Sequence, residues 1–274
     1  MRDDPPFGRN RCGDNRHDLG IAWIRWGSID LCERCAGVRS GSVKAPVPGK
    51  RRFSAARSDD SLTNDQVEYA KLGAKWLFDK LGGKGAVVEI RGIDGVPADA
   101  DRHKGFEEVL KNYPDIKVAA SVFTGWAQNK TAEATKDLLA SGKEIDGIWT
   151  SGIDSTVVTA YQTAGKPYVP VVGADNNGLI GQLIDLKDKG LSGAAVSNPP
   201  AVGAAGLGLA LAVLEKKNPP RVVKISPTVW DNTTGMAELK AAFNPKLDPY
   251  YSDKIDIPPY TSFTMDQLID CKGP

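Results

Sequence analysis

Apolar and polar positions follow two alternating periods from residue 64 onward. Short, mostly apolar runs typical of buried parallel strands lie near 86–91, 116–120, 145–150, 168–173, 192–197 and 221–225. Between these runs, apolar residues recur at helical spacing near 101–113, 127–141, 154–164, 178–189 and 200–217. Strict alternation of this kind predicts an α/β fold with a doubly wound parallel sheet.

A further helix is expected before the first of these strands. Asn64 can cap its N-terminus, Gly82 can close it, and its apolar face consists of Val67, Ala70, Ala74, Leu77 and Leu81. The alternation stops after Ile225. We therefore expect residues 226–274 to form a Pro-rich tail, with scattered aromatic residues, that wraps over a surface of the folded region.

Residues 1–58 differ in composition from the rest of the chain. They contain 12 basic and 6 acidic residues, whereas the remainder contains 23 basic and 28 acidic residues. Ten of the first 12 basic residues are Arg, against three of the later 23. A single domain rarely changes composition so sharply. We expect an irregular segment, translated in a shifted frame or from a misassigned start, that joins the true coding sequence near Asp59–Thr63.

Three of the four cysteines lie in this first segment, and they suggest an alternative. A C-x4-H-x14-C-x2-C zinc site could consist of Cys12, His17, Cys32 and Cys35. Only the C-x2-C pair has a common zinc-ligand spacing, so the motif has low specificity. A zinc-binding fusion through residues 12–35 therefore remains the less favoured interpretation, and we expect no metal site.

Charge and hydropathy exclude two classes of partner. A net charge of +1 indicates neither nucleic acid nor an anionic surface as a partner. The sequence has no apolar run long enough to cross a membrane, so direct membrane insertion is not expected. The first residues, MRDDPPFGRNRCGDNRHDLG, lack the apolar stretch of a signal peptide.

Polar side chains follow the predicted strands, where an open α/β sheet binds its ligands. The candidates for ligand binding are Asp94, Trp126, Asp154, Asp175, Asn176, Ser197 and Asn198. Carboxylates and amides can pair with vicinal hydroxyl groups, and Trp126 can cover the apolar face of a sugar. Helix N-capping is the competing interpretation of each Asp and Asn. Trp149 lies inside a strand and is expected in the core.

Catalytic motifs are not evident. The run Gly82–Gly85 precedes a strand and lacks the Lys-Ser/Thr of a P-loop, and Gly203, Gly206 and Gly208 lie inside a helical run, where close helix packing explains them better. The chain has only two His, and no Ser or Cys sits in a nucleophile elbow. We therefore expect binding without catalysis and without a cofactor.

Residues 63–274 resemble the periplasmic sugar-binding proteins of ABC transporters, of the ribose/galactose type in the periplasmic binding protein type 1 family. The similar segments are GAVVEIRG, DRHKGFEEVL, YPDIKV, DGIWTSGID, QTAGK, VVGAD, AAVSNPPAVGAAG and the closing CKGP. The resemblance implies a non-catalytic component of a sugar importer. It would capture a monosaccharide or polyol in an interlobe cleft in the periplasm and deliver it to the membrane permease.

The resemblance also assigns roles to individual residues. Asp175 matches a carboxylate that binds sugar hydroxyls, Trp126 a stacking aromatic residue, and Ser197 a polar residue where the chain crosses between lobes. The ligand-binding Arg of ribose binders falls at Ala100, which argues against ribose itself. Arg102 matches an Arg that the family keeps more commonly, and we include it among the expected ligand-binding residues.

The expected architecture is thus a doubly wound C-terminal lobe with a partial second lobe and an irregular N-terminal segment. Residues 64–197 correspond to the C-terminal lobe, and residues 198–225 to the helix and strand that cross back to an N-terminal lobe, most of which is absent. The lactose-repressor type of transcription regulator shares this fold and is the alternative. It would need an N-terminal helix-turn-helix, which residues 1–58 do not suggest.

Overall fold

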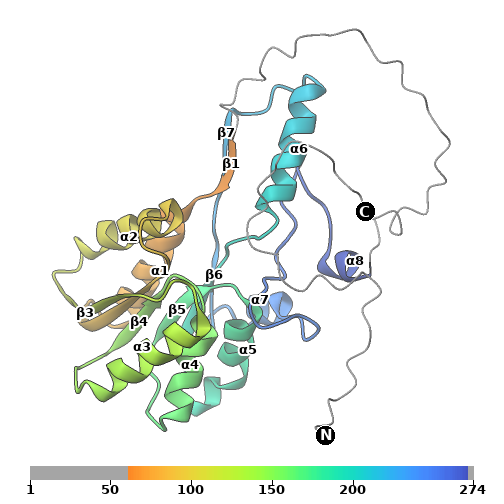
Figure 1. Ribbon diagram of the computed structural model, residues 1–274. Helices are drawn as coiled ribbons and strands as arrows, with labels where there is room; N and C mark the ends of the chain where they lie inside the picture. Colours follow the sequence, from red (N-terminus) through yellow and green to blue (C-terminus); the bar gives the residue numbers. More distant parts are fainter. Residues whose placement is uncertain (1–60, 271–274) are drawn as a thin grey trace, which may run out of the picture. The chain divides into compact units, whose positions relative to one another are not determined.

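The computed structural model describes residues 61–270. Figure 1 shows its elements. They are, in chain order, β1 (Ser61–Asn64), α1 (Gln66–Lys80), β2 (Lys84–Arg91), α2 (Pro97–Leu110), β3 (Asp115–Phe123), α3 (Gln128–Ala140), β4 (Gly147–Thr150), α4 (Asp154–Thr163), β5 (Val171–Ala174), α5 (Asn177–Asp185), the 3-10 turn η1 (Lys187–Lys189), β6 (Gly193–Val196), α6 (Val202–Leu214), β7 (Val222–Ile225), β8 (Val229–Asp231), α7 (Met236–Ala242) and α8 (Met265–Ile269). Segments 1–58 and 12–35, including the possible zinc ligands, lie outside the described residues.

The main sheet has six strands in the order β3-β2-β4-β5-β6-β8. Its first five strands are parallel, and β8 runs antiparallel to β6. The chain order reverses at β2, which lies between β3 and β4, so this is the topological switch point of the sheet. The predicted α/β fold with a parallel sheet is confirmed.

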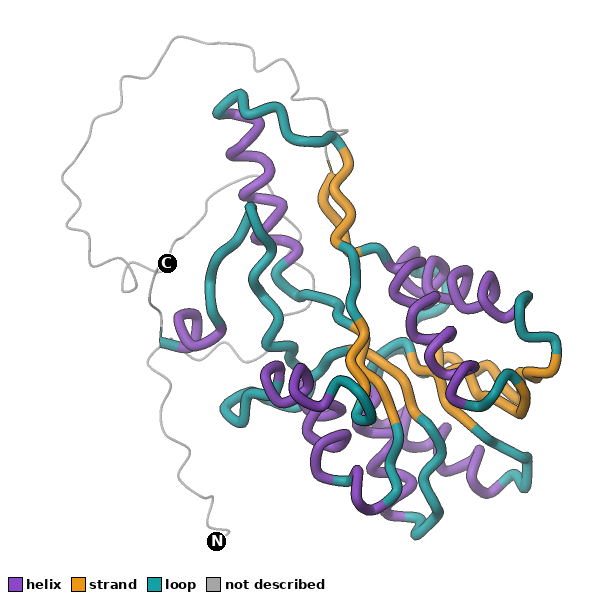
Figure 2. Tube along the Cα trace, turned by 180° about the vertical axis from the view of Figure 1, so that it is seen from behind, coloured by secondary structure: helices purple, strands orange, loops and turns teal. Residues whose placement is uncertain are grey.

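Helices cover both faces of this sheet (Figures 1 and 2). One face packs on α1 and α2, and its core includes Tyr69, Phe78, Phe106 and Trp149. The other face packs on α3, α4 and α5, with a core that includes Ile90, Ile148, Val158, Leu179 and Leu183. Burial on both faces explains the continuous apolar runs of β4, β5 and β6, whose residues are almost all buried, whereas the edge strand β3 is partly exposed. Trp149 lies in the core, as predicted.

Two glycines allow close approaches that position the loops. A side chain at Gly105 on α2 would collide with the backbone oxygen of Val67 on α1, so the two helices can touch only because residue 105 lacks a Cβ. Likewise, Gly208 on α6 packs against the backbone of Tyr260. The interpretation of close helix packing applies to Gly208 but not to Gly203 and Gly206, which have open space around them.

The predicted start of the first helix is wrong by one residue. Asn64 belongs to β1, where it is extended and pairs with Ile225, and the N-cap is Asp65, which accepts a hydrogen bond from the Glu68 backbone at 3.1 Å. Both residue types favour N-caps. Tertiary contacts decide which of the two becomes the cap. The Asn64 side-chain amide is used elsewhere, because it donates to Asn198 Oδ1 at 3.0 Å and to the Pro199 carbonyl at 3.1 Å.

The C-terminal region contains more regular structure than the sequence predicted. Strand β8 adds an antiparallel edge to the main sheet, and α7 buries Leu239 in the core beneath α5. The expectation that the pattern ends at Ile225 is therefore wrong. A three-residue strand and a seven-residue helix are too short to show a period that can be read from the sequence.

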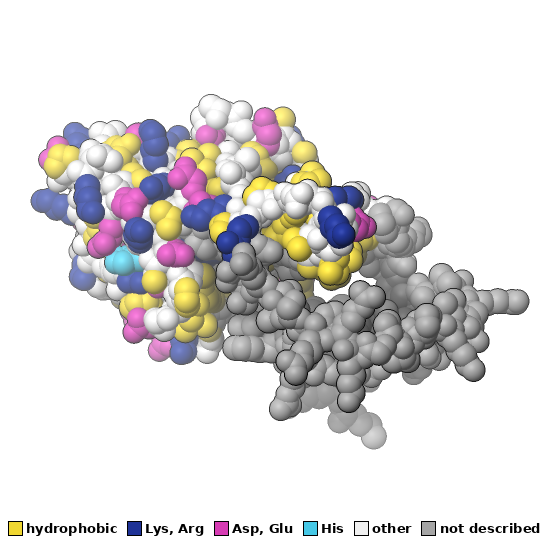
Figure 3. Space-filling view, turned by 90° about the horizontal axis from the view of Figure 1, so that it is seen from above, with side chains coloured by type: hydrophobic (Ala, Val, Ile, Leu, Met, Phe, Trp, Pro, Cys, Tyr) yellow, Lys and Arg dark blue, Asp and Glu magenta, His cyan; other side chains and the backbone are white. Residues whose placement is uncertain are grey.

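Strands β1 and β7 form a separate two-stranded parallel sheet beside α6 (Figure 2). Parallel sheets are normally covered on both faces, and isolated two-stranded sheets are marginal. Three leucines of α6 are exposed: Leu207 at 64%, Leu211 at 50% and Leu214 at 76%. In Figure 3 hydrophobic side chains gather at the surface in the region of this helix. We call these three residues the α6 leucine stripe.

The described residues hold neither a helix that could span a membrane nor a cluster of metal ligands. Between residues 61 and 270, none of the helices is long and apolar enough to cross a membrane. In the same part of the chain, no three His, Cys, Asp or Glu side chains are grouped as metal ligands.

The α6 leucine stripe predicts self-association. Exposed apolar side chains in a row favour burial against another molecule. We expect the chain to exceed its monomer mass at micromolar concentration, and Leu207→Glu with Leu214→Glu to restore the monomer, as measured by light scattering. Leu268→Glu is the matched control, since Leu268 is 49% exposed but lies on α8. A monomeric wild-type chain, or equal effects of both changes, would contradict the prediction.

Candidate functional site

Polar side chains converge at the carboxyl edge of the main sheet. Because β2, β3, β4, β5 and β6 are parallel, the loops that follow them meet at one edge. The N-terminal turn of α1 joins this edge through its hydrogen bonds to the loop after β6. These loops carry the ligand-binding candidates selected from the sequence. Some of them join one hydrogen-bonded network, two form a separate polar pair, and two lie outside both.

Arg102 lies at the centre of a continuous hydrogen-bonded network. It is only 6% exposed; its Nε donates to Gln66 Oε1 at 2.7 Å, and its Nη1 donates to the Ser151 carbonyl. Gln66 in turn donates to Asn198 Oδ1 at 3.1 Å, and the Asn198 backbone N–H donates to Asp175 Oδ1 at 2.9 Å. The structure thus connects three predicted site residues through Gln66. We call this chain of bonds the Arg102 network.

Trp126 joins the same network through its indole nitrogen. Nε1 donates to the Ser151 carbonyl at 3.0 Å, the acceptor that also serves Arg102. The backbone of Trp126 is in the left-handed region at φ 52°, and its ring lies so close to Gly92 that any side chain there would collide with it. The Arg102 guanidinium carbon lies 5.9 Å from the Trp126 ring centroid and 4.4 Å from that of Tyr69. The half-buried indole is therefore held in one orientation.

Asp175 is a buried carboxylate covered by the C-terminal region. It is 2% exposed, and its second oxygen accepts a hydrogen bond from Ser252 Oγ at 2.8 Å. The same segment binds the start of α5, since the Pro249 and Tyr251 carbonyls accept from the backbone of Gly178 and Asn177. Burial raises the pKa of Asp175 to about 6, although the bonds from Ser252 and Asn198 oppose the rise.

Asp154 and Asn176 form a second polar pair. Asp154 is fully buried at the start of α4, and its Oδ2 accepts from Asn176 Nδ2 at 2.8 Å and from the Ala174 backbone at 3.0 Å. Its Oδ1 has no partner among the described residues. Burial raises the pKa of Asp154 to about 7. Asn176 caps α5 by accepting from Leu179 at 3.4 Å, so the N-capping interpretation holds for this residue.

Ser197 and Asp94 are not brought into the Arg102 network. Ser197 Oγ accepts from the Thr228 backbone at 2.8 Å and contacts the Thr228 hydroxyl at 3.1 Å, which anchors the approach to β8. Asp94 is exposed in the turn after β2 and forms no hydrogen bond within residues 61–270. Asp99, in the first turn of α2, instead has the structural role here, accepting from the Gly92 backbone at 2.6 Å and pairing with Arg91.

Several residues of this edge were not found from the sequence. Gln66, Ser151 and Ser252 complete the network, and Tyr69 provides a ring face for Arg102. Gln66 and Tyr69 precede the first long strand, and Ser252 lies in the expected tail, so none of the three follows a strand of the sheet. Only Ser151 stands at a strand end, where its position after β4 could have signalled it.

The network offers hydrogen-bond donors, acceptors and an aromatic face. Arg102 has five N–H groups, and its Nη2 group forms no hydrogen bond within the described part of the chain. His103, the histidine among residues 61–270, lies outside this network: its ring nitrogens contact Glu89 at 2.8 Å and Glu107 at 3.4 Å. Groups of this kind can bind a neutral ligand with several hydroxyl groups.

Known proteins similar to this chain are binding proteins. The chain is 32% identical over 168 residues to a xylitol-binding protein of Mycolicibacterium smegmatis, covering 59% of this chain and 48% of that protein. It is 32% identical over 155 residues to a D-allose-binding periplasmic protein of Escherichia coli, covering 54% and 48%. The chain therefore spans about half the length of the curated relatives it matches.

A solved structure gives a similar result. A periplasmic solute-binding protein of an ABC transporter from Actinobacillus succinogenes, with bound D-allose, superposes with a TM-score of 0.58 at 27% identity. The match covers 66% of this chain and 64% of that protein. An arabinose-transporter binding protein from Shewanella, at 24% identity and a TM-score of 0.58, supports the fold alone.

The extent of the family match decides the assignment. Residues 52–218 match the periplasmic binding protein domain, which is more than half of the chain and includes every strand from β1 to β6. The superposition on the D-allose-bound solute-binding protein, with a TM-score of 0.58, agrees with this match. By sequence and by fold, this chain belongs to the periplasmic binding protein domain family.

Proposed function

We propose that this chain is the sugar-binding part of a solute-binding component of an ABC importer. It captures a monosaccharide or polyol in the periplasm, without catalysis, and presents it to the membrane permease. The observation that carries the proposal is the Arg102 network, which links Trp126, Arg102, Asn198 and Asp175 at the carboxyl edge of the sheet. The relatives named for binding xylitol and D-allose support this ligand class.

Arg102 and Trp126 make the primary contacts in this proposal. The Nη2 group of Arg102 donates to a ligand hydroxyl, while neutral acceptors hold the rest of the guanidinium group in place. Trp126 presents its ring to the C–H face of the ligand, since its indole N–H is already occupied by Ser151. A polar contact combined with an aromatic face selects a polyhydroxylated molecule over a purely apolar one.

Asp175 and Asn198 contribute acceptors at the other end of the network. Each carboxylate oxygen can accept more than one hydrogen bond, so Asp175 can bind a ligand hydroxyl beside Asn198 and Ser252. Because Asp175 is buried by the segment that contains Ser252, this segment moves when the hydroxyl binds. Asp154 and Asn176 position the end of β5 and the start of α5, and Asp94 remains a predicted ligand contact.

The β1–β7 sheet and the α6 leucine stripe support a site that needs a second lobe. The proposed ligand lies between the described edge and further polypeptide that covers β1, β7 and α6. Closing two lobes removes water from the hydroxyl contacts and completes their hydrogen bonds. With one lobe, a ligand exchanges hydrogen bonds to water for hydrogen bonds to protein, with little net gain in free energy. We therefore propose weak binding by this chain.

Ligand binding tests the proposal directly. A panel of xylitol, D-allose, D-ribose and L-arabinose, with glycine betaine as a zwitterionic control, is titrated into the chain and followed by NMR of the indole N–H groups. We expect the Trp126 signal to shift for at least one sugar or polyol, with a Kd of about 1–10 mM, close to 3–4 kcal/mol. No shift with any sugar, or an equal shift with betaine, would contradict the proposal.

A tryptophan pair tests the stacking role. Trp126→Ala should weaken binding about five- to tenfold, because the aromatic face contributes roughly 1 kcal/mol. Trp76→Ala is the matched control: Trp76 is also half-buried, and its Nε1 donates to Asp231 Oδ2 at 3.2 Å, outside the network. Saturation-transfer NMR with the best ligand of the panel measures both variants. Equal affinities of both variants would move the site away from Trp126.

The buried carboxylates predict that stability depends on pH. In the unfolded chain Asp154 loses its proton near its ordinary pKa of 3.8, whereas in the folded chain it keeps the proton up to about pH 7. The folded state therefore holds the extra proton between these values, and the free energy of unfolding falls as pH rises from 4 to 7. We expect Asp154 to lower the free energy of unfolding by about 2–4 kcal/mol over this pH range.

Asp154→Asn isolates this effect. The amide can still accept from Asn176 and Ala174 but does not titrate, so the variant should lose clearly less stability than the wild type between pH 4.5 and 7.5. Denaturant unfolding at the two pH values gives the comparison. Asp146→Asn is the control, since Asp146 accepts from Ala86 at 2.7 Å but is only half-buried. Identical slopes for wild type and Asp154→Asn would contradict the assigned pKa.

A further inference from the structure

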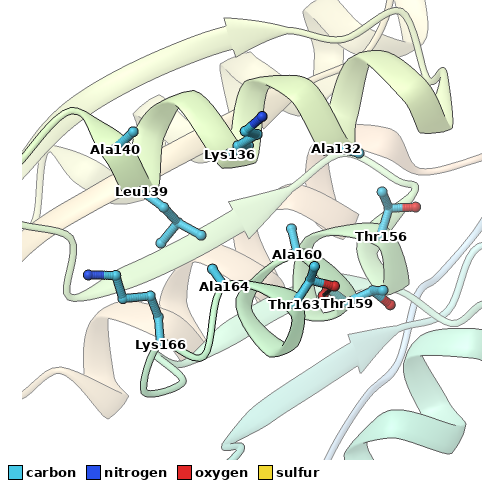
Figure 4. A pocket seen from close by; sticks show the side chains of 10 residues that line it. All are labelled: Ala132, Lys136, Leu139, Ala140, Thr156, Thr159, Ala160, Thr163, Ala164 and Lys166. Atoms are coloured by element: carbon cyan, nitrogen blue, oxygen red, sulfur yellow. Dashed lines mark hydrogen bonds between the residues drawn. The ribbon is translucent and has the colours of Figure 1, made fainter.

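A groove runs between α3 and α4, on the outer side of the main sheet (Figure 4). Its cavity volume is about 740 Å³, within the range of about 300–1,000 Å³ that is usual for sites of small molecules. None of its lining residues belongs to the Arg102 network, so it is distinct from the proposed sugar site. The lining residues are Ala132, Lys136, Leu139, Ala140, Thr156, Thr159, Ala160, Thr163, Ala164 and Lys166.

The floor of the groove is apolar even where its residues are polar by type. Thr159 and Thr163 turn their hydroxyls back to the backbone of α4, donating to Ser155 at 2.8 Å and to Thr159 at 2.9 Å. Gln182 also donates to the Thr159 hydroxyl, at 3.0 Å. The hydroxyls of Thr159 and Thr163 are thus occupied, whereas Thr156 adds a hydroxyl at the far end of the groove. Leu139 from α3 extends between the two helices in Figure 4, toward Ala164 of α4.

Small residues on both helices keep the groove open. On α3, Ala132 and Ala140 lie two turns apart, and on α4 Ala160 stands opposite Leu139 (Figure 4). Larger side chains at these positions would interdigitate and close the space, as ridges and grooves do between ordinary packed helices. The space left between α3 and α4 is therefore a consequence of side-chain size.

The charged side chains that line the groove are all positive. Lys136 and Lys166 are both exposed, and neither of their ammonium groups forms an ion pair or a hydrogen bond within residues 61–270. No carboxylate lines the groove. An apolar floor beside two ammonium groups without counter-charges complements a molecule that has an apolar body and a negative head.

We infer that the α3–α4 groove binds an amphiphilic anion, a free molecule with an aliphatic or aromatic body and one carboxylate or sulfonate group. The apolar body lies on Leu139 and Ala160, and Lys136 of α3 and Lys166 of the turn after α4 supply positive charge from the two sides of the groove. Binding here does not require the second lobe, since all the lining residues belong to α3, α4 and the turn that follows α4. The inference is therefore independent of the proposed sugar site.

The anionic fluorophore 8-anilinonaphthalene-1-sulfonate is a suitable probe. It is titrated into the full chain carrying Leu207→Glu and Leu214→Glu, so that the α6 leucine stripe does not compete for the dye. We expect saturable binding of one dye molecule per chain, weakened at least tenfold by Ala160→Phe, which fills the groove. Lys136→Glu and Lys166→Glu should each weaken it about three- to tenfold, less so at high salt.

Two controls keep the result interpretable. Lys187→Glu changes an exposed lysine of η1 away from the groove and should leave dye binding unchanged. Octanoate should displace the dye several-fold better than 1-octanol, because only octanoate has the anionic group. The charge variants alter exposed residues only, so they test the site even if Ala160→Phe fails to fold.

Three outcomes would overturn the inference. The first is absence of saturable dye binding in the chain that lacks the leucine stripe. The second is binding that Lys136→Glu, Lys166→Glu and a folded Ala160→Phe all leave unchanged, which would place the dye elsewhere. The third is equal displacement by octanoate and 1-octanol, which would show that the site recognises no charge.

Discussion

The buried guanidinium group of Arg102 is the interaction on which the candidate site depends. A buried charge is costly unless its hydrogen-bond donors are satisfied. Here the partners are neutral: the Gln66 side chain, the Ser151 carbonyl and the ring faces of Tyr69 and Trp126. Because no carboxylate of residues 61–270 bonds directly to it, the positive charge stays available to a ligand. Satisfying this one group ties α1, α2, the loop after β3 and the loop after β4 to a common point.

The double covering of the sheet explains why polar groups gather where they do. With α1 and α2 on one face and α3, α4 and α5 on the other, the inner strands β4, β5 and β6 are almost wholly buried, so their polar neighbours are concentrated in the loops at their ends. Asp154 and Asp175 are the extreme cases, because burial there raises both pKa values into the neutral range. Such perturbed groups are concentrated at functional sites, although structural networks produce them too.

The C-terminal region takes part in the site. Ser252 donates to Asp175, and the carbonyls of Pro249 and Tyr251 bind the first backbone N–H groups of α5. A helix N-terminus leaves such groups without intrahelical partners, and here the returning chain supplies the acceptors. A segment that lies far along the sequence therefore controls the exposure of the carboxylate that the family resemblance assigns to sugar hydroxyls.

The sequence by itself determined the alternation of strands and helices, the core position of Trp149 and the family, because burial on two faces and repeated βα units leave periodic patterns. It also placed Asp175, Trp126 and Asn198 at the ends of strands on one edge, and the family resemblance added Arg102. Only the tertiary structure decided how they connect: Gln66, Tyr69 and Ser252 come from segments that follow no strand of the main sheet. It also decided that Asn176 is a helix cap and that Asp94 stands apart. The periodicity of a sequence reports which face of a helix or strand is buried. Which distant segment supplies a hydrogen-bond partner depends on the path of the folded chain, and periodicity does not report that path.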